Sequence, residues 1–122
     1  MIKILTIDDE YEFTDMIRNY FEPRGYKVFV ASEGETGLKI AGAEKPDVAL
    51  IDLKMPGLHG EEVLKKMKEV SPKTVSIIIS ASQGEMRKRE HFLELGAFEC
   101  FDKPLTSLRD LESKIKEALG RR

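Results

Sequence analysis

The chain has 122 residues, a formal net charge of −2, and 34% charged and 41% hydrophobic residues, a balance typical of one soluble globular domain. Its only cysteine, Cys100, excludes an internal disulfide and a cysteine-rich zinc site and is typical of a reducing, cytoplasmic location. Interspersed charges argue against direct nucleic-acid binding, and no apolar run approaches the roughly 20 residues that cross a membrane. We therefore expect residues 1–122 to be a single domain, free-standing or the amino-terminal module of a longer protein.

Strand-like and helix-like patterns alternate along the chain. Five short apolar runs predict buried strands: residues 2–7, 26–31, 48–51, 75–79 and 97–101. Five segments with apolar residues at helical spacing follow them in turn: residues 13–21, 32–41, 63–70, about 83–95 and 108–119. The alternation predicts an α/β fold with an open parallel sheet covered by helices on both faces.

Particular residues mark where the helices begin and end. Ser32 with Glu35, and Ser107 with Asp110, have the spacing of capping pairs at helix starts. Gly96 suits a left-handed turn after the fourth helix. Phe92 on that helix fits either a core position or a partner-binding position.

The strands end in residues that can carry chemistry. Asp8 and Asp9 follow the first strand, Asp52 follows the third, Ser80 ends the fourth, and Lys103 follows the fifth. Because the carboxyl ends of parallel strands share one edge, we expect these side chains to meet there.

Three carboxylates at one edge repel each other by about 4 kcal/mol per pair, at an effective dielectric of about 20 and a separation of about 4 Å. A divalent cation would remove this cost, and an all-oxygen ligand set favours Mg²⁺ or Mn²⁺ over zinc. Mg²⁺ commonly bridges a phosphate, for which Lys103 and Ser80 offer an ammonium and a hydroxyl. Asp52 is then the candidate nucleophile, forming an aspartyl phosphate.

These motifs together resemble the response-regulator receiver domain of two-component signalling, over the whole chain. They are the segments 7–10 (IDDE), 52–57 (DLKMPG), 80–81 (SA), 96–97 (GA) and 103–104 (KP). The resemblance implies a flavodoxin-like, doubly wound fold with strand order 2-1-3-4-5.

The resemblance also implies a role for each site residue. Asp52 would be the phosphoacceptor, Asp9 a direct Mg²⁺ ligand, and Asp8 a partner acting through metal-bound water. Lys54 would offer its backbone carbonyl to the metal. Ser80 and Lys103 would bind the phosphoryl group, and Ser80 would act as a switch residue by moving toward it. The protein would phosphorylate and dephosphorylate itself without being a conventional turnover enzyme.

The implied partners are a sensor histidine kinase or phosphotransfer protein upstream, and a downstream protein or fused output domain. The output surface would be the face built by the helix near 83–95, the strand at 97–101 and the last helix. Cys100 departs from the family pattern, because it stands where a switch aromatic is usual. This departure leaves a second function open, that of a scaffold receiver that binds its partner whether or not Asp52 is phosphorylated.

Two other functions fit less well. A phosphatase of the haloacid dehalogenase type would need an aspartate at position 10, where this chain has Glu10. Flavin binding would need a phosphate-cradling loop after the first strand, and that loop is acidic.

Overall fold

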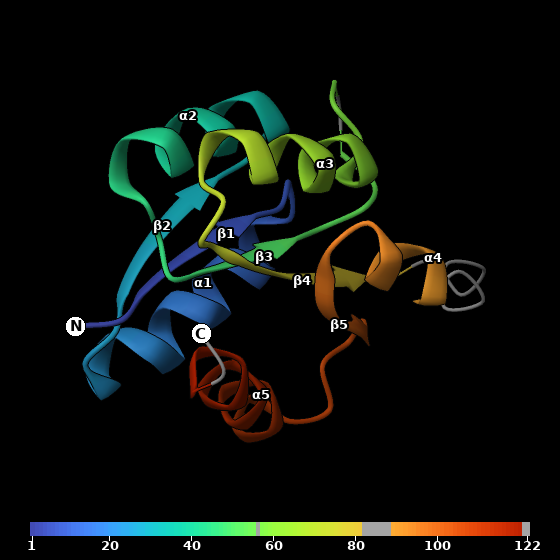
Figure 1. Ribbon diagram of the computed structural model, residues 1–122. Coiled ribbons are helices and arrows are strands. Elements are labelled where there is room, and N and C mark those ends of the chain that lie inside the picture. Colours follow the sequence, from blue (N-terminus) through green and yellow to red (C-terminus); the bar gives the residue numbers. More distant parts are fainter. Residues whose placement is uncertain (56, 82–88, 121–122) are drawn as a thin grey trace.

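The computed structural model describes residues 1–55, 57–81 and 89–120. Its centre is a sheet of five parallel strands in the order β2-β1-β3-β4-β5 (Figure 1). The strands are β1 (Lys3–Ile7), β2 (Lys27–Ala31), β3 (Val48–Ile51), β4 (Val75–Ser80) and β5 (Ala97–Asp102). The doubly wound, flavodoxin-like architecture and its strand order are confirmed.

Helices cover both faces of the sheet, as the alternating pattern predicts (Figure 1). One face carries α1 and α5, and the other carries α2, α3 and α4. The helices are α1 (Tyr11–Phe21), α2 (Gly34–Glu44), α3 (Gly60–Val70), α4 (Arg89–Glu94) and α5 (Leu108–Gly120), with a short 3-10 turn η1 (Glu22–Arg24) after α1. Among the described residues, no helix is long and apolar enough to span a bilayer.

Alternating strand residues supply the two halves of the core. On β1, Ile4 packs with α1 and α5, whereas Leu5 and Ile7 pack with α2 and α3. The central strand β3 is buried throughout, which explains its unbroken apolar run. Phe92 is 2% exposed and belongs to the core, which decides between its two predicted roles.

The predicted helix ends are confirmed in part. Asp110 donates its backbone N–H to Ser107 Oγ at 3.1 Å, and Gly96 adopts a φ of 113° after α4. The capping box at Ser32 is wrong, because α2 begins at Gly34 after Glu33 and no side-chain cap is found there among the described residues. The start expected near residue 83 lies outside the described residues.

Candidate functional site

Backbone hydrogen bonds that continue the sheet bring the predicted site residues to one edge. Asp8 donates its N–H to Ala31 O at 2.9 Å, and Asp52 donates to Ile7 O at 3.0 Å. Lys103 likewise donates to Ser80 O at 2.9 Å. The hydrogen-bond ladder of the sheet therefore extends past the strand ends. It fixes the backbone of Asp8, Asp52 and Lys103 independently of their side-chain contacts.

Helix α3 supports the loop that carries Asp52. Gly60 begins this helix and donates its N–H to Leu53 O at 3.1 Å. A Cβ atom at Gly60 would lie 2.4 Å from Asp52 O, so only glycine permits this approach of the two backbones.

The Lys103 ammonium is the centre of the site. Its Nζ lies 2.7 Å from Asp8 Oδ2, 2.6 Å from Glu10 Oε1 and 3.8 Å from Asp52 Oδ2. The Phe13 ring also faces the ammonium, with its centroid 4.6 Å from Nζ. The Lys103 side chain is only 8% exposed, so its charge depends on these neighbours for compensation.

Burial and neighbouring charges shift the ionisation of the site. Burial, followed by the charge of Asp8, raises the pKa of Asp52 to about 6, although Lys103 opposes the rise. Burial also raises the pKa of Asp8, against the hydrogen bond from Lys103. Burial alone would lower the pKa of Lys103, but its contacts with Asp8 and Glu10 outweigh burial and raise it.

Three carboxylates form a cluster suited to a divalent cation. One oxygen each of Asp8, Glu10 and Asp52 lies within 4.8 Å of the others. These donors are all oxygens, and the cluster includes two buried carboxylates, so the residues present fit Mg²⁺ or Mn²⁺. Such a cation would favour ionised Asp52, opposing the effects of burial and of Asp8.

The cluster differs from the predicted ligand set. Asp9 is exposed and is not one of the three, although its charge contributes to the raised pKa of Asp52. Lys54 donates its backbone N–H to Asp52 Oδ1 at 3.4 Å, which places it beside the carboxylate. Sequence reasoning missed Glu10, and the available signal was its position directly after two acidic residues.

The two predicted switch positions are both buried. Ser80 is 4% exposed at the end of β4, and Cys100 is 7% exposed on β5. Burial raises the pKa of the Cys100 thiol to about 11, as is typical of an unreactive cysteine in a protein core. Pairing of Ser80 with Asp102 links the end of β4 to β5.

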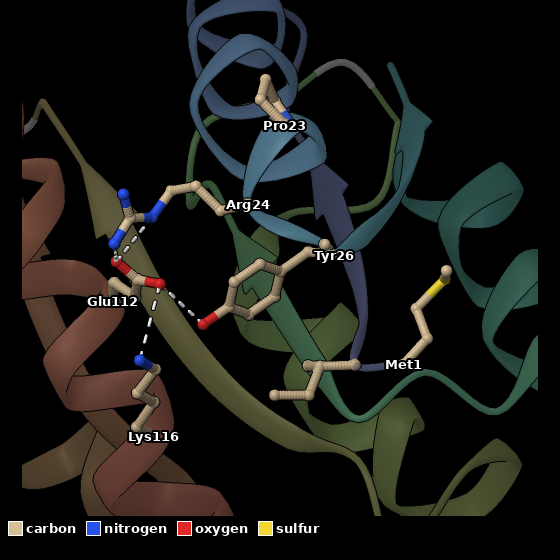
Figure 2. Close-up of a pocket in the computed structure, with 8 residues that line it drawn as sticks. Met1, Pro23, Arg24, Tyr26, Glu112 and Lys116 are labelled. Atoms are coloured by element: carbon tan, nitrogen blue, oxygen red, sulfur yellow. Dashed lines mark hydrogen bonds and ion pairs between the residues drawn. The ribbon is translucent and has the colours of Figure 1, made fainter.

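A hollow lies beside η1, at the end of the sheet opposite to the Lys103 site (Figure 2). Its polar groups converge on the buried carboxylate of Glu112, which pairs with Arg24, Tyr26 and Lys116. Because these groups neutralise one another, the hollow lacks the concentrated negative charge of the strand-end site.

Comparisons with known proteins identify the family of the chain. Residues 4–116 match the family described as the response regulator receiver domain. Sporulation initiation phosphotransferase F of Bacillus subtilis (strain 168) is 37% identical, with 92% of this chain and 91% of that protein covered. The transcriptional regulatory protein PhoP of alkaline phosphatase synthesis, from the same organism, is 36% identical, and the match covers 98% of this chain but 49% of PhoP.

Solved structures show the same fold. A CheY-like receiver domain protein from Methanospirillum hungatei JF-1 superposes with a TM-score of 0.90 at 31% identity, covering 99% of this chain and 95% of that one. A receiver domain protein from Clostridium thermocellum gives 0.90 at 33% identity, covering 99% and 96%. The chain spans about half the length of PhoP and most of the length of the phosphotransferase. By its sequence match and its fold, the chain belongs to the response regulator receiver domain family.

Proposed function

We propose that the chain is a phosphorylation-controlled switch whose acceptor is Asp52. The observation that carries the proposal is a carboxylate only 6% exposed, placed beside a second buried carboxylate and a buried ammonium. A purely structural site would gain little from this arrangement, because each buried charge costs desolvation energy. A phosphoryl group would use the same charges for binding and positioning.

The donor would be a phosphohistidine on a sensor kinase or phosphotransfer protein. An Asp52 oxygen attacks phosphorus, a P–O bond forms, the P–N bond breaks, and the imidazole keeps the electron pair and takes a proton. Lys103 and the Ser80 hydroxyl then bind phosphoryl oxygens. Attack of water on phosphorus later releases inorganic phosphate and regenerates the Asp52 carboxylate, so the chain limits its own signal.

Mg²⁺, or Mn²⁺ in its place, would neutralise negative charge between the donor phosphate and the carboxylates. The proposed ligands are Asp8, Asp9, Asp52 and the carbonyl of Lys54, with Asp8 acting largely through metal-bound water. Glu10 adds a further carboxylate at the mouth of the same cluster. The same carboxylates would attract both the cation and the Lys103 ammonium.

The output would pass through the face formed by α4, β5 and α5. Glu99 on β5 makes ion pairs with Arg89 on α4 and with Lys114 on α5, the latter at 3.7 Å. A shift of Ser80 toward a phosphoryl group would act on this face through β4 and β5. A downstream protein or a fused output domain would recognise this face, and the chain would not itself bind nucleic acid.

The test is phosphorylation by acetyl phosphate, followed by intact mass spectrometry. With Mg²⁺ we expect one labile phosphate-sized mass increase, lost when EDTA is added beforehand. The Asp52→Asn variant should show no increase. An increase that persists in Asp52→Asn would refute Asp52 as the acceptor, and an increase that persists in EDTA would refute the metal requirement.

A scaffold receiver is the second candidate, and Cys100 is the observation that favours it. A small buried thiol stands at the position of the usual aromatic switch, which weakens the proposed coupling between Asp52 and the output face. A scaffold would bind its partner with equal affinity with and without Asp52 phosphorylation, whereas a switch would not. Titration of one partner against both forms separates the two functions.

A further inference from the structure

We propose that Glu10 is a positioning residue for Lys103, which it holds away from Asp52 in the unphosphorylated protein. Glu10 thereby competes with a phosphoryl group for the same ammonium. The inference rests on the proposed function, because it assigns Lys103 to the phosphoryl group on Asp52.

The distances around Nζ set the direction of the effect. Glu10 and Asp8 hold the ammonium at 2.6 and 2.7 Å, which are ordinary lengths for charge-assisted contacts. Asp52 lies 3.8 Å away, beyond hydrogen-bond distance. In this arrangement the short contacts of the Lys103 ammonium therefore go to Glu10 and Asp8 rather than to Asp52.

The backbone of Glu10 is fixed, so its side chain reaches Lys103 from a defined point. Its N–H donates to Asp8 Oδ1 at 2.8 Å, and its carbonyl accepts from Phe13 and Thr14 at 3.1 and 3.2 Å. These contacts anchor it at the start of α1. Its side chain is 59% exposed, which places this carboxylate at the rim and leaves Asp8 and Asp52 inside.

The size of the effect follows from this exposure. Solvent screens a contact made by a rim carboxylate, so loss of the contact should change a competing equilibrium by about two- to fivefold. Asp8 and the Phe13 ring continue to hold the ammonium in the site when Glu10 is removed. Removal of the Glu10 charge should therefore redirect Lys103 toward Asp52 without releasing it to solvent.

The first experiment detects the contact itself, in the unphosphorylated protein. NMR signals of the Lys103 side chain are compared between the unmodified chain, Glu10→Gln and Glu12→Gln. Glu12 is an exposed carboxylate in the first turn of α1, so its variant controls for the loss of one nearby charge. We expect the Lys103 signals to shift in Glu10→Gln only. Equal shifts in both variants, or none, would overturn the inference.

The second experiment measures competition, with beryllofluoride as the phosphoryl mimic and Mg²⁺ at saturation. Glu10→Gln should bind beryllofluoride about two- to fivefold more tightly than the unmodified chain, and Glu12→Gln should not differ. Unchanged or weaker binding by Glu10→Gln would overturn the inference and leave the proposed function intact. Failure of the unmodified chain to bind beryllofluoride would refute both, even where the NMR shift confirms the contact.

Discussion

Glu112 provides the sharpest test of how this fold is stabilised. Its carboxylate, on α5, accepts hydrogen bonds from the hydroxyls of Tyr20 and Tyr26 at 3.0 and 2.9 Å (Figure 2 shows Tyr26). Arg24 Nε also donates to it at 3.0 Å. One buried side chain thus joins α5 to α1, η1 and the residue preceding β2. Substitution of Glu112 by Gln keeps the shape and one acceptor oxygen but removes the charge.

The magnitude follows from the burial of each contact. The bond from Tyr26 is buried, and a hydrogen bond to a charged group contributes about 1.5–3 kcal/mol. The Arg24 side chain is 49% exposed, and solvent screens its ion pair, so that contact contributes little to stability. Glu112→Gln should therefore lower the free energy of unfolding by about 2 kcal/mol. For a chain of this length, that loss lowers Tm by about 8 °C.

Urea unfolding followed by far-UV circular dichroism measures this loss, since the chain has no tryptophan for fluorescence. Glu69→Gln, at an exposed position on α3, makes the same chemical change and should stay within about 0.5 kcal/mol of the unmodified chain. A loss in Glu112→Gln no larger than in Glu69→Gln would refute the reasoning. It would mean that the buried charge contributes no net stability.

Further predictions concern the pH dependence of stability, the close approach at Gly60 and the reactivity of Cys100. Burial opposes ionisation of Glu112, but its hydrogen bonds outweigh burial and lower its pKa, so its contribution to stability should be lost as pH falls below about 4.5. Burial, reinforced by Glu112, raises the pKa of Tyr26 to about 12, so stability should also fall as pH rises from about 10 toward 12. Urea unfolding measured across pH checks both the acidic and the alkaline loss of stability. Gly60→Ala should lower the free energy of unfolding by about 1–3 kcal/mol and slow phosphorylation of Asp52 by acetyl phosphate, because the added Cβ would lie 2.4 Å from Asp52 O. Unchanged stability and an unchanged phosphorylation rate would contradict the close approach of the two backbones. The Cys100 thiol should react with a thiol reagent far more slowly in the folded protein than in urea, and equal rates would contradict its burial and raised pKa.

The sequence determined the fold because its signals are local and agree with one another. Apolar runs of strand length alternate with helical periodicity, and each run ends close to the observed strand end. The parallel arrangement then followed from the crossover helices, and it placed Asp8, Asp52, Ser80 and Lys103 at one edge. The strand order itself came from the family resemblance, since periodicity does not distinguish among parallel orders.

Which charges meet depends on the three-dimensional packing of the chain. Glu10 and Lys103 are 93 residues apart in sequence, and Tyr20 and Glu112 are 92 apart. Such contacts depend on the direction in which each side chain leaves a fixed backbone, and a sequence pattern specifies only the element and its face. The Ser32 capping box is wrong for a related reason, because α2 begins at Gly34, which packs so closely on Val63 that a Cβ atom would lie 2.6 Å from it. The local pattern of strands and helices therefore predicts where the site lies, whereas long-range packing determines that Glu10 contacts Lys103.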